Sequence, residues 1–88
     1  MNYVYVLISK KDGQCYVGST TDLRRRLLEH NNGKSAATMS RRPFLLVYYE
    51  AYRNEDDARK REQALKRRGQ ARYHLVKRIA KSLRQAQT

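Results

Sequence analysis

The chain contains 88 residues, and its 20 Lys and Arg residues against 8 Asp and Glu residues give a formal net charge of +12. A chain this short forms one domain with a small core, because typical domains hold about 50 to 250 residues. No apolar stretch reaches the ~18 residues that cross a bilayer, and the first residues lack the features of a signal peptide. We therefore expect a cytoplasmic protein with a polyanionic partner rather than a membrane, since so large a charge excess disfavours a compact chain through self-repulsion.

The N-terminal segment predicts a β-hairpin. Residues 2–8 alternate so that apolar or aromatic side chains point to both faces, which is typical of a strand buried on both sides. Turn residues at 10–13, ending in Asp12 and Gly13, precede a returning strand at 15–18. Cys15 is the only cysteine, which excludes an internal disulfide and a Cys-rich zinc site, and we expect it to be a buried structural thiol.

Residues 19–33 predict the first helix and its two ends. The hydroxyl side chains of residues 19–21 offer N-cap oxygens, and Asp22 complements the positive end of the helix dipole. Leucines at 23, 27 and 28 recur at helical spacing until an Asn-Asn-Gly sequence at 31–33 ends the helix. Residues 34–43 are polar and basic without a period, and are expected to form a loop.

The second half predicts one strand and two helices. Residues 44–52 are apolar on both faces and rich in aromatic and β-branched side chains, so this strand is expected to be central. Asn54 can cap a second helix that Gly69 ends, and the apolar spacing from 71 to 83 predicts one further helix. Residues 85–88 are expected to fray, so the domain is expected to span residues 1–84. The resulting order is β-β-α-β-α-α, an α+β fold.

Positive charge concentrates in the last third of the chain. Residues 58–88 contain eleven Lys and Arg residues and a single acid, Glu62. The first helix and the loop after it add charge of the same sign, which is the electrostatic footprint of phosphate-backbone binding. The alternative is a solvated helix face, but ordinary surface helices mix both signs. The residues expected to bind nucleic acid, most likely DNA, are Arg24, Arg25, Lys34, Arg41, Arg42, Lys66, Arg67, Arg68 and Arg72.

Two tyrosines and one helical stripe are candidates for chemistry. Tyr5 and Tyr16 lie on adjacent strands of the predicted hairpin, where side chains on one face approach within roughly 5 Å at Cβ. Asp22, Arg26 and His30 are spaced by four residues and so share one face of the first helix. The alternatives are that the tyrosines only pack, and that Asp22 pairs with Arg26 beside a solvated His30.

Glu62 is a lone carboxylate among basic neighbours and should be firmly ionised. Hard divalent metals such as Mg²⁺ take only one or two protein carboxylates and complete their shell with water and phosphate oxygens. One Glu is therefore enough for a metal site, although an ion pair with Lys66 at i+4 is an equal alternative. In the last helix, Tyr73 and His74 either contact nucleic acid or, as we favour, pack half-buried.

Taken together, these residues resemble the GIY-YIG nuclease superfamily. Tyr3-Val4-Tyr5 stands in place of the GIY motif, and Tyr16-Val17-Gly18 stands in place of YIG. The stretch at 17–33 and the segment DDARKREQALKRR around Glu62 support the match, which covers nearly the whole chain. The similarity is strongest to small stand-alone bacterial proteins of this superfamily.

The resemblance implies a three-stranded antiparallel sheet flanked by helices, and cleavage of DNA phosphodiester bonds with one divalent metal ion, Mg²⁺ or Mn²⁺. It carries over Tyr5, Tyr16, Arg26, His30 and Glu62 as catalytic residues, with Glu62 as the metal ligand. We hypothesise that Arg26 neutralises charge in the transition state and that Tyr5 orients or deprotonates the attacking water. The expected setting is DNA repair, recombination or related processing, where a protein partner could supply specificity.

One departure from the family and one alternative function accompany this hypothesis. Several nucleases of the superfamily use a further Asn in the last helical region, whereas this chain has no Asn after Glu62. A non-catalytic basic module that keeps the fold and binds nucleic acid is the alternative.

Overall fold

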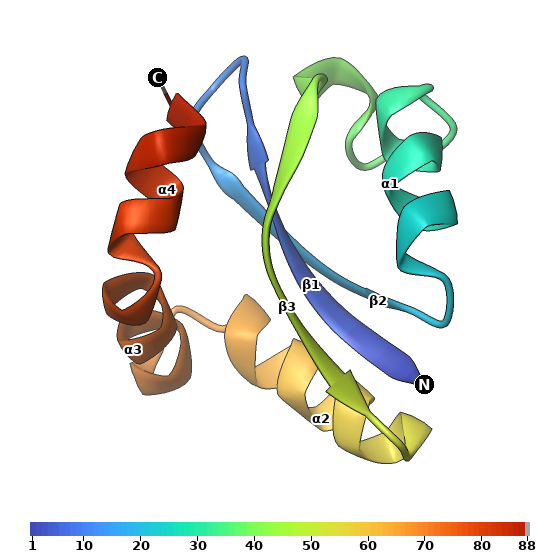
Figure 1. Ribbon diagram of the computed structural model, residues 1–88, viewed down its shortest axis with the longest axis vertical. Coiled ribbons are helices and arrows are strands. Elements are labelled where there is room, and N and C mark those ends of the chain that lie inside the picture. The colour runs from blue at the N-terminus through green and yellow to red at the C-terminus, as the bar shows by residue number, and fades with distance from the viewer. Residues whose placement is uncertain (88) are drawn as a thin grey trace.

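The computed structural model describes residues 1–87 and contains one three-stranded antiparallel sheet with helices on both faces (Figure 1). The strands are β1 (Asn2–Ser9), β2 (Cys15–Thr20) and β3 (Phe44–Tyr52), in the spatial order β2-β1-β3. The predicted α+β fold with a three-stranded antiparallel sheet is therefore confirmed. The hairpin is also confirmed, and Gly13 supplies the positive φ of 71° that its turn requires.

The central strand is β1, so the prediction that β3 would be central is wrong. Residues Val4 to Ser9 of β1 are all buried, because β1 is paired on both sides and covered on both faces. By contrast, β3 pairs only with β1 and leaves Leu45 and Tyr49 exposed. The apolar composition of β3 therefore reflects an edge strand whose outer positions stay partly open.

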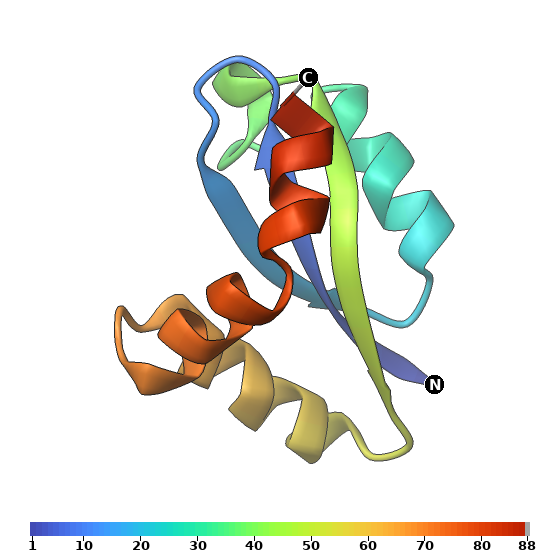
Figure 2. The same cartoon turned by 60° about the vertical axis from the view of Figure 1, so that its left-hand side comes forward.

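Helices cover both faces of the sheet (Figures 1 and 2), and each face has its own core. On one face, α1 (Leu23–Asn31) packs Leu23 and Leu27 against Tyr5, Leu7 and Phe44, whereas Leu28 is exposed. On the other face lie α2 (Glu55–Lys66), α3 (Gln70–Arg78) and α4 (Ala80–Gln87). This second core is built on side chains from β1, β2, α2, α3 and the junction between α3 and α4: Val4, Val6, Val17, Ala58, Leu65, Leu75 and Ile79. The alternation of β1 thus divides its side chains between the two cores.

The first helix begins later than the hydroxyl residues suggested. Strand β2 continues to Thr20, and Asp22 is the N-cap, because its side chain accepts a hydrogen bond from the Arg25 amide at 3.1 Å. The hydroxyl of Thr20 accepts from the Asp22 amide and so fixes the entry into the helix. Residues 34–43 were expected to form an irregular loop. This segment contains one short 3₁₀ turn, η1 (Met39–Arg41).

The single C-terminal helix that the sequence predicted is two helices, α3 and α4, separated at Ile79. Backbone hydrogen bonds continue through the break, from Ile79 to Leu75 and from Leu83 to Ile79, so the helix bends rather than stops. The bend lets α3 contact α2 while α4 contacts β3. The apolar spacing is the same on both sides of the bend, which is why it predicts one helix.

Residues 85–87, which were expected to fray, belong to α4, and the end of this helix contacts the hairpin. Lys10 donates from Nζ to the Ala86 carbonyl at 2.8 Å, and Figure 1 shows the C-terminal end of α4 beside the β1–β2 turn. Thr88, the rest of that predicted tail, lies outside the described residues. None of the helices within residues 1–87 has the length and apolar character needed to span a membrane.

Candidate active site

A buried hydrogen-bonded chain connects β1 to α1 and to the loop that follows α1. The Tyr5 hydroxyl lies 2.8 Å from His30 Nε2, and His30 Nδ1 lies 2.7 Å from the Thr38 hydroxyl. His30 and Thr38 have no exposed surface, and Tyr5 is almost fully buried. In the tautomer with the proton on Nδ1, His30 donates to Thr38 and accepts from Tyr5. The alternative of a solvated His30 is therefore wrong.

Gly18 lies directly opposite Tyr5 on β2 and leaves the space that the tyrosine occupies. A Cβ atom at Gly18 would overlap the Tyr5 hydroxyl and approach ring carbon Cζ to 2.5 Å. The backbone of Gly18 has ordinary negative φ, so its requirement is for space rather than for conformation. This contact gives a physical reason for a glycine at the end of the second tyrosine motif.

Tyr16 and Arg26 complete this face of the site. Tyr16 packs edge-on against His30, with ring centroids 5.2 Å apart, and its hydroxyl has no hydrogen-bond partner within residues 1–87. Arg26 reaches from α1 to the Tyr5 hydroxyl and also pairs with Glu29, at 3.2 Å. The alternative of an Asp22–Arg26 ion pair is wrong, because Asp22 caps the helix and Arg26 pairs with Glu29 instead.

Burial and the contacts of Arg26 shift the pKa values of Tyr5, Arg26 and His30. Burial raises the pKa of Tyr5, although the hydrogen bond and charge of Arg26 act to lower it. Partial burial lowers the pKa of Arg26, but its bonds to Tyr5 and Glu29 outweigh this and raise it. Burial, with the nearby Arg26 charge, lowers the pKa of His30, so His30 is neutral at pH 7. A neutral imidazole can accept a proton from the Tyr5 hydroxyl.

Glu62 of α2 is held against the face of β2 that lies opposite the Tyr16 side chain. Ser19 of β2 donates from its hydroxyl to Glu62 Oε1 at 2.7 Å, and Lys66 pairs with Oε2 at 2.8 Å. Burial raises the pKa of Glu62, but the bonds from Lys66 and Ser19, together with the charges of Lys66 and Arg59, lower it overall. The carboxylate is therefore ionised at neutral pH. The ion-pair alternative for Glu62 describes a contact that is present, and it leaves the carboxylate partly accessible.

A second network anchors the helix that carries Glu62. Glu50 of β3 receives a bidentate contact from Arg61 of α2, with Nε and Nη2 both 2.9 Å from its oxygens. The hydroxyls of Tyr48 and Tyr52 also donate to Glu50. Burial, and after it the hydrogen bond to Glu50, raises the pKa of Tyr52 to about 12. Arg61 precedes Glu62, so the network fixes α2 against the sheet beside the candidate metal ligand.

The five predicted catalytic residues thus form two groups around β2. Tyr5, Tyr16, Arg26 and His30 lie together on the α1 face, whereas Glu62 lies on the α2 face beside Ser19. The groups share one electrostatic environment, since the Glu62 charge contributes to raising the pKa of Tyr5. Because β2 is an edge strand and Gly18 has no side chain, little more than backbone separates them.

The residues present fit a metal that is bound mainly by water and phosphate. No group of three or more His, Cys, Asp and Glu side chains within residues 1–87 could enclose an ion. Glu62 instead offers one ionised carboxylate, which suits Mg²⁺ or Mn²⁺ because such ions need only one or two protein carboxylates. Any ion at Glu62 would compete with Lys66 for Oε2.

The basic residues expected to bind nucleic acid differ in whether their side chains already contact other groups of the protein. Arg41 is engaged within the protein, because it pairs with Asp12 at 2.7 Å and lowers the pKa of that carboxylate to about 2. Arg42 donates to the Met39 carbonyl, and Arg25 pairs with Glu29 on the surface of α1. The remaining residues are exposed or half-buried: Arg24, Lys34, Lys66, Arg67, Arg68 and Arg72.

Comparison with known proteins identifies the family. A model of the GIY-YIG catalytic domain matches residues 1–80. The chain belongs to the GIY-YIG family. A UPF0213 protein of Streptococcus pneumoniae is 45% identical over 67 residues, which cover 75% of this chain and 67% of that protein. A UPF0213 protein of Desulfotalea psychrophila is 46% identical over 66 residues, covering 73% of this chain and 59% of that protein.

A solved structure supports the same assignment. The solution NMR structure of a UPF0213 protein from Bacillus halodurans has a TM-score of 0.53 and 37% sequence identity, and covers 86% of this chain and 82% of that chain. The fold is therefore that of a small stand-alone GIY-YIG protein. The family is one of nuclease domains, and the names of these relatives state no activity.

Sequence reasoning missed three partners of the site. Thr38 lies in a segment without a period, so no local pattern marks it as the buried partner of His30. Ser19 was expected near the helix start, yet it lies on the α2 face of β2 with Val17. Glu50 is a lone acid in an aromatic strand, and that oddity was the one signal that could have suggested a cationic partner such as Arg61.

Proposed function

We propose that this protein is a metal-dependent DNA endonuclease that hydrolyses phosphodiester bonds at the edge of β2. One observation carries the proposal. An ionised carboxylate, Glu62, is held by Ser19 on one side of the strand, while the Tyr5–His30 pair and Arg26 lie on the other. General acid–base groups, a cation and a metal-binding carboxylate around one open strand edge are what phosphate-ester hydrolysis requires.

Arg26 and the tyrosines are assigned to the phosphate and the water. Arg26 neutralises charge that develops on the phosphate oxygens, and its contact with Tyr5 keeps the two groups aligned. Tyr5 orients the attacking water, takes a proton from it and at the same time passes its own hydroxyl proton to neutral His30 at Nε2. The free hydroxyl of Tyr16 donates to a phosphate oxygen. Thr38 holds the imidazole in the tautomer that this transfer needs.

Glu62 is assigned as the ligand of a single Mg²⁺ or Mn²⁺. A divalent ion there supplies charge neutralisation to the scissile phosphate and its leaving oxygen. Ser19 keeps one carboxylate oxygen in place, and Lys66, which pairs with the other oxygen, would contact a DNA phosphate in place of Glu62 if an ion occupied the carboxylate.

The partner is DNA in the cytoplasm, in repair, recombination or a related process. The net charge of +12 supports a polyanionic substrate, and phosphate contacts dominate the affinity of such proteins. The exposed cations Arg24, Lys34 and Arg67 extend the binding surface beyond the catalytic groups. A protein partner supplies specificity, because phosphate contacts made by such cations carry no sequence information.

The test compares the unmodified protein with Glu62→Ala on labelled single-stranded, duplex and branched DNA, with Mg²⁺, Mn²⁺ or EDTA. We expect cleavage by the unmodified protein only, in metal only, and equal DNA binding by both proteins. Glu55→Ala is the matched control, because Glu55 is an exposed carboxylate on the same helix. Cleavage that survives Glu62→Ala would remove the metal assignment.

A non-catalytic DNA-binding module is the second candidate, and the Lys66–Glu62 ion pair is the observation that favours it. In that case Lys66 permanently occupies the carboxylate and the site is vestigial. Binding without cleavage on every substrate and with either metal would support this candidate, and Lys66→Gln would then fail to restore cleavage.

A further inference from the structure

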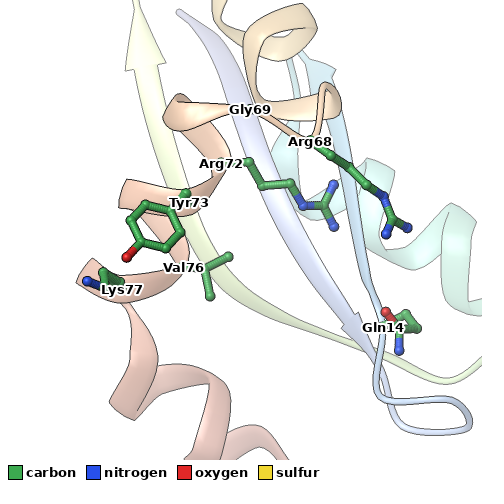
Figure 3. Close-up of a pocket in the computed structure, with 7 residues that line it drawn as sticks. All are labelled: Gln14, Arg68, Gly69, Arg72, Tyr73, Val76 and Lys77. Carbon is green, nitrogen blue, oxygen red and sulfur yellow. The ribbon is translucent and has the colours of Figure 1, made fainter.

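A hollow of about 370 Å³ lies away from all five candidate catalytic residues, between the β1–β2 hairpin and the start of α3 (Figure 3). Its lining is Gln14, Arg68, Gly69, Arg72, Tyr73, Val76 and Lys77, and we call it the α3 hollow. Figure 3 shows the side chains of Arg68 and Arg72 extending toward Gln14 across its upper part. Val76 provides an apolar patch between these cations and Tyr73. The volume is within the range of small-ligand sites.

The cations of the α3 hollow are not neutralised by the protein. Within the described residues 1–87, no carboxylate lies within 4 Å of Arg68, Arg72 or Lys77, although six ion pairs form elsewhere. Arg72 is half-buried and lines a small neighbouring cavity together with Cys15. Two guanidinium groups that line the same hollow, one of them half-buried, form a binding place for a phosphate group.

Tyr73 gives the α3 hollow an aromatic wall. The residue is 56% exposed, so a large part of the ring is open to solvent while the rest packs as expected. Lys77 Nζ lies 4.7 Å from the ring centroid and His74 contacts the ring edge-on, so the exposed ring is held in place. An exposed, fixed aromatic ring beside cations is the arrangement on which unpaired bases stack.

The α3 hollow and the candidate active site lie along one strand edge. Gln14 immediately precedes β2, and Ser19, the partner of Glu62, lies five residues further along the chain. At about 3.3 Å per residue, this separates the two places by roughly 17 Å. That span corresponds to about five nucleotides along a duplex strand, which rises 3.4 Å per nucleotide.

We propose that the α3 hollow binds one unpaired nucleotide of a DNA strand, with its base against Tyr73 and Val76 and its phosphate between Arg68 and Arg72. The strand then continues along β2 toward Glu62. The preferred substrate has a single-stranded extension a few nucleotides from the position that is cut. The link to cutting rests on the proposed function, whereas binding in the hollow does not.

The test measures fluorescence anisotropy in EDTA with three labelled DNAs: a short single strand, a blunt hairpin duplex, and the same hairpin with a single-stranded extension. Tyr73→Ala should weaken binding of the single strand and the extended hairpin by at least about fivefold, with the blunt hairpin unchanged. Tyr73→Phe keeps the ring and should bind as the unmodified protein does. Lys81→Gln is the control for loss of one surface charge outside the hollow.

Equal affinity of Tyr73→Ala and Tyr73→Phe for the extended hairpin would overturn the proposal, and so would an equal loss on all three DNAs. Arg68→Gln should also lower the salt slope on the extended hairpin by about one. The same DNAs with metal separate this proposal from the nuclease assignment. Tyr73-dependent binding without cleavage removes only the nuclease, whereas Glu62-dependent cleavage with no effect of Tyr73→Ala removes only the hollow.

Discussion

The Tyr5 hydroxyl and His30 Nε2, from β1 and from the last turn of α1, are 2.8 Å apart in the interior of the protein. The hydroxyl of Tyr5 also contacts Arg26, and it leaves no room for a side chain at Gly18. The position of one hydroxyl therefore depends on both flanking elements, α1 and β2. Small changes at either element should alter the chemistry of Tyr5 before they unfold the domain.

Gly18→Ser tests the space that Tyr5 requires. Because Tyr5 packs with Leu7 and Phe44 and is 2% exposed, its ring cannot swing away from an added Cβ. We expect a loss of stability of about 1–3 kcal/mol, as for other overpacked cores, together with loss of cleavage. Chemical denaturation and the cleavage assay measure the two effects.

Gly69→Ser is the matched control for that change, since nothing lies within 4 Å of a Cβ at Gly69 and a serine suits the N-cap of α3. Its stability should equal or slightly exceed that of the unmodified protein. If Gly18→Ser were as stable and as active as Gly69→Ser, the close approach of Tyr5 would have no functional role.

The buried imidazole predicts a pH dependence of stability near neutrality. Burial, with the Arg26 charge, lowers the pKa of His30 below its usual 6.5, so below pH 6.5 the unfolded chain binds a proton that the folded chain does not. Stability is therefore complete above about pH 6.5 and falls as the pH drops toward the pKa of folded His30. One proton limits the slope to about 1.4 kcal/mol per pH unit.

Denaturant unfolding at several values between about pH 7.5 and 5 measures this slope. It should vanish in His30→Gln and persist in His74→Gln, because His74 is an exposed residue of α3. Glu50 and Glu62 do not interfere, since their pKa values are lowered from 4.5 and they titrate at more acidic pH. An unchanged slope in His30→Gln would mean that another group carries the dependence.

The elements of the fold were largely predictable because each has a local cause. The hairpin follows from alternation and from Gly13, and the capping of α2 follows from Asn54, whose side chain accepts from the Asp56 amide. The position of β3 at the edge was not predictable, because an apolar strand pattern does not record how many neighbours a strand has. The bend at Ile79 was not predictable either, because the apolar residues keep one helical period through α3 and α4.

The site shows the same division between local and long-range causes. The shared face of Tyr5 and Tyr16 follows from strand pairing, and the spacing of Arg26 and His30 follows from the helix. Thr38 reaches His30 only because the loop after α1 folds back through η1, a contact that no short segment encodes. The placement of Glu62 on the other face of β2 likewise depends on how α2 crosses the sheet.

The Glu50–Arg61 pair predicts that α2 is held in place from β3. Arg61→Gln leaves Glu50 charged and largely buried without its bidentate partner, so we expect a loss of about 3 kcal/mol, the low end for buried pairs because both side chains are partly exposed. Arg59→Gln should cost less than about 1 kcal/mol, since the Arg59–Glu55 pair on the same helix is well exposed. Glu50→Gln in the Arg61→Gln background should recover part of the loss, because it removes the unpaired charge.

Hydrogen exchange should show faster exchange in α2 for Arg61→Gln than for Arg59→Gln, and cleavage should fall with it, because Glu62 follows Arg61 on that helix. Equal exchange in α2 for the two variants would mean that the apolar contacts of Ala58 and Leu65 are sufficient to position Glu62.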